Sequence, residues 1–525
     1  MTCARIPDEN EIALATGFPS RMARLRHLVA IGAEACWGKP IPAATAQRLE
    51  EELSFIERVS ASDPRLDFAS YFLIIRDCVK DVRGRGALAG PWRGAASGSA
   101  VAYALGITTV DSVKHGLFFE RFLGQSRIAL PPVWLDFDAE GHETAVRHIA
   151  DRYRECGLET PSRIIIEFHA LKPLSVQRKC LRLVAERSGI DIDLERIPDS
   201  DQATMSVFAD ADTRDIFQFG SPEAMRWLRQ IRPSCLADIT AIGTLFYSPG
   251  LAMLFSDIVS RKNGEGPVEC GHPLMESVLN ETYGTVIYQE QIMSLAQRLA
   301  GFTRGESDAL RYAMGKKMFD DTEKMKAKFI AGCLANPAFR VGEWRGESAA
   351  KSLCEKIWAD WWSVSSIAFN KSHAVAYTRL AWQSAYLKAH HPREYEEAFD
   401  FCYNVGEDNK SKKDEQFISN AITTIQAQNK DREISIAKDS KKPIAKRNYC
   451  LATTHQNQIE KFSEIVKHIS KNQSMVLTWD EIIDSMYDTE DKTLGIKSDT
   501  EKLRTFYEKA LDEIRKQTTT SMRNA

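Results

Sequence analysis

One short stretch, PPVWLDFDAEG at residues 131–141, constrains the fold and the chemistry of this chain more than any other. Apolar and acidic side chains alternate along it, a pattern typical of a half-buried β-strand. Positions 133, 135 and 137 are expected to face a core, so Trp134, Asp136 and Asp138 share the other face. Two carboxylates two residues apart on one strand face can bind a divalent metal ion. The stretch therefore predicts either a metal site or one altered by the tryptophan.

The bulk properties exclude several classes of protein. At 525 residues the chain is long enough for several domains with a sizeable core. A net charge of −3 gives no global field that would indicate nucleic acid or a membrane. The eleven cysteines show no zinc-binding spacing and are expected to be reduced. No secretory signal and no bilayer-length apolar run is evident, which predicts a cytoplasmic protein without a membrane partner.

The pattern along the chain predicts helices with few strands. Amphipathic segments near 20–60 and a helix near 67–84 precede a Gly/Ser-rich loop and an apolar helix. A second strand is expected in SRIIIEFHALK, with Glu167 and His169 on one face. Residues from about 190 to 400 are mainly helical. After about 405 lysine outnumbers arginine by about three to one, whereas the earlier part is arginine-rich, and this change predicts a boundary.

Several strings, in order, resemble the alpha subunit of bacterial DNA polymerase III, the family C replicative polymerases. The strings are GPWRGAASGSAVAYALGIT, LFFERFL, YGTVIYQEQIMSLAQ, ALRYAMGKK and AFNKSHAVAYTRLAWQSAYLKAHHP. The resemblance covers roughly residues 20–400. It implies an α+β fold: a small mixed palm sheet of the polymerase-beta-like nucleotidyltransferase type with helices, then a mainly helical fingers domain.

The resemblance also implies a domain order. We expect a palm-like domain at 1–185, a helical fingers-like domain at 186–405, and an unrelated Lys/Asn/Gln-rich helical tail at 406–525. The family's thumb is expected to be missing near residues 155–163, where only the short connection ECGLETPS is present. The family's N-terminal phosphoesterase-like domain, clamp-binding region and oligonucleotide-binding fold are also not found.

The family places three catalytic acids on two palm strands, and the resemblance assigns their positions here. Asp136 matches the second acid, Trp134 stands at the first, and Glu167 stands at the third, one methylene longer. The acids bind two Mg²⁺ ions about 3.5–4 Å apart, which activate the primer hydroxyl and stabilise the leaving pyrophosphate. An indole cannot ligate a metal. Asp138 could replace the lost acid, although its carboxylate is shifted by two residues along the strand; it could also be a solvated residue of the following turn.

Further residues are implied to bind nucleotide or DNA. By resemblance, Gly98 and Ser99 match the family's Gly-Ser pair and Arg93 faces the triphosphate. A glycine-rich loop before a helix can bind phosphate, but such a loop alone is equally typical of a flexible turn. Ala95 replaces a usual serine and Trp92 a glycine. The fingers are expected to contribute two groups that face the nucleotide or template: Arg311, Lys316 and Lys317, and Asn370, Lys371 and His373. Without the resemblance, Lys316 and Lys317 would be read as a solvated helix end.

Three hypotheses remain open for the function. The first is a minimal template-directed DNA polymerase of bacterial DNA replication, which adds deoxynucleotides to a primer 3′ end with Asp136, Asp138 and Glu167 as Mg²⁺ ligands. Its partners would be primer-template DNA, deoxynucleoside triphosphates and replisome proteins. The second is an impaired or inactive relative that binds DNA or a replication partner. The third is a degraded or chimeric gene with an acquired tail. We expect Trp134 to block the metal site more than Asp138 restores it.

Overall fold

The computed structural model describes residues 2–5, 17–63, 66–124, 130–131, 133–152 and 163–405. Contacts between residues divide the chain after Tyr403 into two units, and the first contains every strand and α-helix of the described residues. The predicted tail of residues 406–525 lies outside the described residues, as does nearly all of the segment at 155–163 where the thumb is predicted to be missing. Among the described residues, no helix is long and apolar enough to cross a membrane.

The N-terminal part surrounds a small sheet with helices, as the apolar periodicity predicts. Ser20 accepts a hydrogen bond from the amide of Ala23 at 3.1 Å and begins the first helix, and Gly38, with φ +83°, ends it. Asp67 begins the helix at 68 in the same way, by accepting from Ser70 at 3.0 Å. The helices of this part are α2 (Arg21–Trp37), α3 (Ala43–Ser62), α4 (Phe68–Gly84), α5 (Ala100–Ala104) and α6 (Ala139–Arg152).

The three strands of the described part form one sheet in the order β1-β3-β2. They are β1 (Thr2–Arg5), β2 (Val133–Phe137) and β3 (Arg163–Ala170), and β1 is antiparallel and β2 parallel to β3. The prediction that the strands around Asp136 and Glu167 pair in one sheet is confirmed, with Trp134 opposite Glu167 and Asp136 opposite His169. Because α6 lies in sequence between the two parallel strands, it provides the crossover that parallel pairing requires.

One face of the sheet belongs to the core. Val133, Leu135 and Phe137 are at most 1% exposed and pack with buried residues of α4 and α6. Phe168 of β3 joins them, with its ring centroid 5.6 Å from that of Phe137. The alternating pattern of the acidic stretch is therefore confirmed on its apolar side. The other face is left for Trp134, Asp136, Glu167 and His169.

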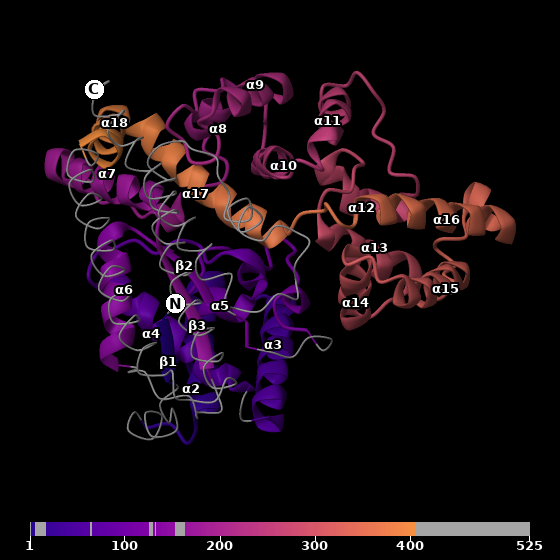
Figure 1. The fold of residues 1–525 in the computed structure, drawn as a ribbon, viewed down its shortest axis with the longest axis horizontal. Helices are drawn as coiled ribbons and strands as arrows, with labels where there is room; N and C mark the ends of the chain where they lie inside the picture. Colours follow the sequence, from indigo (N-terminus) through magenta and orange to yellow (C-terminus); the bar gives the residue numbers. More distant parts are fainter. Residues whose placement is uncertain are drawn as a thin grey trace, which may run out of the picture. The chain divides into compact units, whose positions relative to one another are not determined.

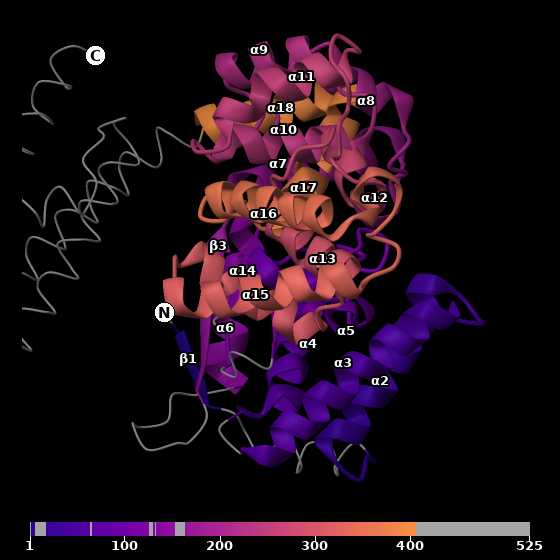
Figure 2. The same ribbon diagram turned by 90° about the vertical axis from the view of Figure 1, so that its right-hand side faces the viewer.

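The remainder of the first unit is helical. Its helices are α7 (Lys172–Ser188), α8 (Gln202–Ala209), α9 (Pro222–Ile231), α10 (Leu236–Tyr247), α11 (Phe255–Lys262), α12 (Pro273–Leu279), α13 (Gln289–Ala300), α14 (Arg304–Gly315), α15 (Phe319–Ala335), α16 (Glu347–Val364), α17 (Lys371–His390) and α18 (Pro392–Asp400), with a π-helical turn at Phe401–Val405. In both ribbon views α2 and α3 lie at one end, and α8 to α11 lie toward the other (Figures 1 and 2).

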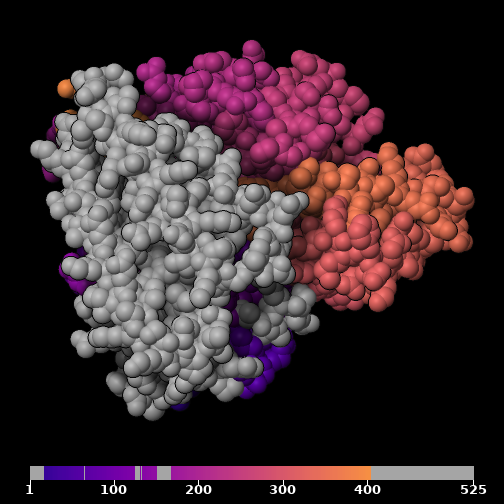
Figure 3. Space-filling view, viewed as in Figure 1, coloured from indigo at the N-terminus to yellow at the C-terminus, as the bar shows by residue number. Residues whose placement is uncertain are grey.

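The buried apolar residues form three main clusters. One contains α2 to α6 and β2, a second joins α7 to α11 with α17 and α18, and a third holds α12 to α16 together. In the space-filling view, α12 to α16 make up the lobe at the right (Figure 3). The helix α17 contacts the second cluster along its length and reaches the loop at 94–98 with its first turns. That contact brings the start of α17 to the open face of the sheet.

Candidate functional site

The open face of the sheet carries the residues that sequence reasoning assigned to chemistry. Trp134 and Asp136 lie on β2, and Glu167 and His169 lie beside them on β3. Their exposure differs sharply. Asp136 is 1% exposed as a residue, whereas Trp134 is 39% exposed. The side chain of Glu167 is 29% exposed and that of His169 is 39% exposed.

Asp136 is bound by an arginine. The segment after Leu88 runs antiparallel along the outer edge of β2, with the amide of Gly90 donating to the Asp136 carbonyl at 2.7 Å. This places Arg93 beside the Asp136 carboxylate, and its Nε lies 2.9 Å and 2.8 Å from the two oxygens. A second guanidinium nitrogen also donates to Oδ1. Two-pronged pairing of this kind is the strongest ordinary carboxylate contact.

The pair affects the pKa of the arginine. Burial alone would lower the pKa of Arg93, but the hydrogen bonds and the charge of Asp136 outweigh it, and the pKa of Arg93 is raised overall. Gly90 permits the close approach, because a side chain there would meet Asp136 Cβ at 3.0 Å. Arg93, which is expected to face a triphosphate, here pairs with Asp136, one of the predicted metal ligands.

Asp138, the other predicted metal ligand on this stretch, also has partners within the protein. It follows the last residue of β2 and begins α6, where the amide of Gly141 donates to its carboxylate at 2.9 Å. The amide of Leu88 donates to the other oxygen. Arg178 of α7 completes the arrangement at 2.8 Å, and the Asp138 side chain is only 2% exposed. Asp138 is thus a buried helix cap with its own counter-charge, and not a solvated turn residue either.

The residues present do not fit a pair of Mg²⁺ ions. Magnesium requires near-octahedral oxygen ligands, usually carboxylates that bridge the ions. Asp136 and Asp138 each have an arginine partner, and Trp134 has no oxygen. Among the described residues, Glu167 is the one acid of the predicted set that forms no ion pair with an arginine; the imidazole of His169 lies 3.9 Å from its carboxylate. Within the described residues, no group of three His, Cys, Asp or Glu side chains is placed to hold a metal ion.

The phosphate loop is filled by an internal carboxylate. Glu52 of α3, 1% exposed, accepts hydrogen bonds from the hydroxyl of Ser99 at 2.8 Å and from the amides of Ala100 and Val101 at 3.0 and 3.1 Å. Arg48 donates to the same carboxylate at 2.6 Å. The N-terminus of α5 therefore already has its anion.

Gly98 and Ser99, which are predicted to contact a nucleotide, are both buried. Ser99 is fully buried, and its hydroxyl accepts from Ala102 while donating to Glu52. Gly98 is buried, and a Cβ there would lie 2.7 Å from the Phe118 carbonyl oxygen. Gly98 is needed for close packing of two backbone segments, and no ligand can approach from that side.

The start of α17 does reach the open face. Asn370 caps the helix by accepting from the amide of His373 at 3.0 Å. His373 accepts a hydrogen bond at Nδ1 from the amide of Gly94 at 3.2 Å, so this nitrogen is unprotonated. Burial, with the charge of Arg93, lowers the pKa of His373 to about 4. Lys371 is held by Glu281, with both oxygens 2.8 Å from Nζ.

The three predicted basic residues at the end of α14, Arg311, Lys316 and Lys317, do not point to one common site. Arg311 pairs with Asp308 one turn earlier on α14. Lys317 donates to Ser365 at 3.2 Å and to the Trp362 carbonyl, and its Nζ lies 4.0 Å from the Trp362 ring centroid. Burial lowers the pKa of Lys317. Lys316 is exposed at the end of α14. Among the described contacts, none joins these three residues to the sheet face.

Comparison with known proteins shows which family this chain resembles. A model of the bacterial DNA polymerase III alpha NTPase domain matches residues 23–226, and a model of the bacterial DNA polymerase III alpha subunit finger domain matches residues 173–337. The chain belongs to the DNA polymerase III alpha subunit family. It is 28% identical to the DNA polymerase III subunit alpha of Aquifex aeolicus, over 66% of this chain and 41% of the relative. The corresponding protein of Bacillus subtilis is also 28% identical, over 69% of this chain and 41% of the relative.

The chain thus spans about two-fifths of the length of these DNA polymerase III alpha relatives. The matched residues include the acidic strand, the loop at 90–99 and most of the helical part. The predicted family membership and its association with DNA polymerase and bacterial relatives are confirmed. The two family models do not reach α17, which carries His373, or the tail.

Three residues that act at or near the site were missed by sequence reasoning. Arg178 neutralises Asp138, Glu52 fills the phosphate loop, and Tyr377 lies one helical turn after His373 with ring centroids 4.4 Å apart. Burial raises the pKa of Tyr377 to about 12. The i, i+4 spacing could have indicated Tyr377. Arg178 and Glu52 left no signal, because their partners are 40 and 47 residues away in the chain.

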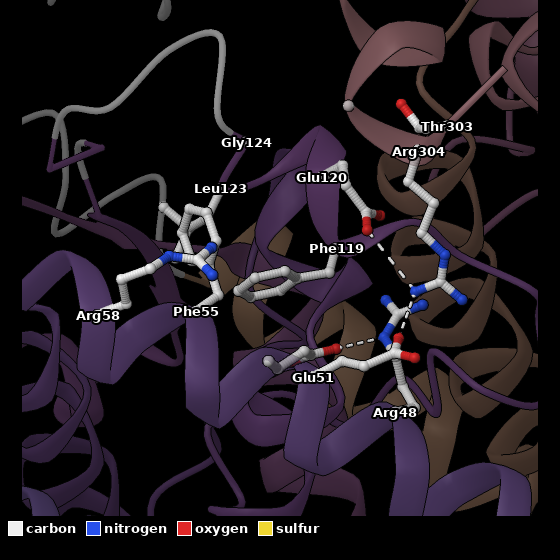
Figure 4. A pocket seen from close by; sticks show the side chains of 12 residues that line it. Arg48, Glu51, Phe55, Arg58, Phe119, Glu120, Leu123, Gly124, Thr303 and Arg304 are labelled. Carbon is white, nitrogen blue, oxygen red and sulfur yellow. Dashed lines mark hydrogen bonds and ion pairs between the residues drawn. The ribbon is translucent and has the colours of Figure 1, made fainter.

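A separate pocket of about 470 Å³ lies between α3, the segment at 119–124 and the start of α14. Phe55, Phe119 and Leu123 give it an apolar side (Figure 4). Arg304 closes it by donating to Glu51 at 2.7 Å and approaching Glu120 at 3.6 Å. None of the predicted catalytic or nucleotide-binding residues lines this pocket, so it does not correspond to the predicted active site.

Proposed function

We propose that this chain is a non-polymerising member of the DNA polymerase III alpha subunit family, which acts by binding DNA or a replication partner. In this proposal the sheet and α2 to α6 correspond to the family's palm, and the helical part to its fingers. The observation that carries the proposal is the ion pair of Arg93 with Asp136. It gives the remaining catalytic acid a permanent organic counter-charge in the place where the family's chemistry needs metal ions.

The cost of reversing this arrangement supports the proposal. For Asp136 to ligate Mg²⁺, Arg93 would have to leave a side chain that is fully buried. Separating a buried, doubly hydrogen-bonded ion pair leaves charges uncompensated, at a cost of about 3–5 kcal/mol. Even then a second carboxylate would be missing at Trp134. Glu167 alone could give a weak single-ion site, which does not support two-metal phosphoryl transfer.

The groups that were predicted to bind the nucleotide also support the proposal. Polymerase relatives must bind a triphosphate, yet the amides at the start of α5 are hydrogen-bonded to Glu52 and the guanidinium of Arg93 to Asp136. Lys371 and Arg311 are paired with acids. These contacts leave Lys316 as the exposed cation of the predicted set. In this proposal the protein therefore keeps the polymerase fold but has no free triphosphate site.

Primer extension by the full-length chain tests the proposal. We expect no extension of a 5′-labelled primer on a template with all four deoxynucleoside triphosphates and Mg²⁺ or Mn²⁺, under conditions where an intact DNA polymerase III alpha subunit extends it fully. Anisotropy of the same labelled DNA measures binding independently of chemistry. Robust extension by the unaltered chain that is lost in Asp138→Asn would contradict the proposal and would establish Asp136 and Asp138 as the catalytic pair.

A further inference from the structure

The replaced acid and its neighbour create a surface with a different chemistry. Trp134 exposes 39% of its surface at the place where the family has a carboxylate. The parallel register puts Glu167 directly beside it on the next strand, on the same face. Neighbouring strands are about 4.8 Å apart, so the indole and the carboxylate are adjacent. An indole face and a carboxylate next to each other form a site of a kind that attracts cations.

The charges on this face favour a cation over a phosphate. The permanently charged side chains that act on it are Arg93, Asp136 and Glu167, and the first two cancel. Glu167 leaves one negative charge. Within the described residues, its carboxylate accepts no hydrogen bond, and the imidazole of His169 lies 3.9 Å away. This carboxylate would repel a phosphate group.

The surroundings leave room above the indole. Gly94, with φ +73°, borders the ring, and an added Cβ would stand 3.9 Å from it. His373 directs its Nδ1 to the Gly94 amide, which fixes the loop at this point. Trp134 is therefore held at one edge while part of its surface remains open. The loop that borders the indole is fixed by this hydrogen bond, so the indole side of the site is preorganised.

We propose that Trp134 and Glu167 form a docking site for an arginine side chain of a partner protein. A guanidinium can stack on the indole while donating to the carboxylate, and arginine is the cation that combines these two contacts best. The inference rests on the proposed function, since a working polymerase would need the same face for metal ions and primer. The partner is thus a protein that presents an arginine side chain to the face with Trp134 and Glu167.

Fluorescence anisotropy with a labelled (Arg-Gly)₅ peptide tests the inference on the full-length chain. We expect Trp134→Ala to weaken binding by about five- to twentyfold, the range of a partly desolvated cation–π contact, and Trp134→Phe by less. Glu167→Gln should weaken binding by about threefold at low salt and have no effect at high salt. A (Glu-Gly)₅ peptide should not bind.

Two matched variants serve as controls. Tyr312→Ala removes another aromatic side chain of nearly equal exposure, 38%, on α14, and Glu143→Gln removes an exposed acid of α6, on the core side of the sheet. Both should bind the peptide as the unaltered chain does. Circular dichroism and thermal unfolding verify that Trp134→Ala remains folded. If this variant does not fold, Trp134→Phe and Glu167→Gln still test the docking site.

The outcomes separate the two proposals. Equal peptide binding by the unaltered chain, Trp134→Phe and Glu167→Gln overturns the docking site. Tighter binding of oligo(dT) than of the peptide, lost in Trp134→Ala, also overturns it and assigns the face to single-stranded nucleic acid. Extension of a primer in the same preparations overturns the proposed function itself. If the peptide does not bind and no primer is extended, only the docking site is overturned.

Discussion

Arg93 and Asp136 form a bidentate ion pair on the open face of the sheet, where the resemblance predicts catalytic acids. Asp136 is completely buried in this pair, and Arg93 is only a quarter exposed. The pair is a structural contact between β2 and the loop at 89–94. Removing either partner should therefore affect stability more than any metal-dependent property.

Replacing Arg93 with methionine should lower the free energy of unfolding by about 3–5 kcal/mol, because Asp136 then stays buried without a counter-charge. The double variant Arg93→Met/Asp136→Leu should recover part of this loss, since no charge remains buried. Urea denaturation at pH 7, followed by circular dichroism, measures both. Arg85→Met is the control, because its ion pair with Asp81 has an arginine that is 63% exposed. A loss no larger than in this control would contradict the structural role.

Arg178 offers a parallel test for Asp138. Arg178→Met should cost about 2–4 kcal/mol, because the capping carboxylate loses a buried partner at 2.8 Å. The matched variant Arg182→Met lies one turn later on α7, where the ion pair with Glu140 is 52% and 64% exposed, and should cost less than about 0.5 kcal/mol. Thermal unfolding of the two variants side by side distinguishes them. Equal stability would mean that Asp138 does not depend on Arg178 and is available for another ligand.

Glu52 should behave as a structural anion of the loop. Glu52→Gln weakens hydrogen bonds from Ser99, Ala100 and Val101 and removes the charge that Arg48 meets, so we expect a loss of about 1–3 kcal/mol. Glu51→Gln, one residue earlier and 43% exposed, should have little effect. Chemical denaturation measures the difference. If Glu52→Gln were as stable as Glu51→Gln, the α5 amides would not require an internal carboxylate.

His373 should make stability depend on pH. Burial lowers its folded pKa to about 4 from an ordinary value of 6.5, so the unfolded chain binds the proton more readily. The stabilisation from neutral His373 is present above pH 6.5 and is lost as the pH falls toward 4. Between pH 7 and 4.5 the unaltered chain should therefore lose about 2 kcal/mol more than His373→Gln.

Urea titrations at several pH values measure this difference. His115 provides the comparison, because burial lowers its pKa to about 4 as well and it lies away from Asp136, near Asp199 and Lys114. His115→Gln should remove a similar pH-dependent amount. The same pH profile in the unaltered chain and in His373→Gln would show that His373 is not buried in its neutral form.

Much of the local structure could be predicted from the sequence. The alternation at residues 133–137 indicated a strand with one apolar face, and the strand with Glu167 and the helices near 20–60 and 67–84 followed from equally local signals. These features depend on residues within a few positions of one another, where periodicity and capping act. The substitution of Trp134 for an acid was also visible in the sequence, through the resemblance to the family.

The tertiary structure alone decided which charges are free. Asp136, Asp138 and Ser99 looked available in the sequence, but Arg93, Arg178 and Glu52 reach them across 43, 40 and 47 positions. Such contacts leave no local pattern, because the chain folds them together only when the sheet, α3 and α7 pack. A buried carboxylate must find a counter-charge or hydrogen-bond donors, and several arginines and amides of this chain could have supplied them. The sequence by itself determined which polymerase residues are present, and packing determined that they bind one another.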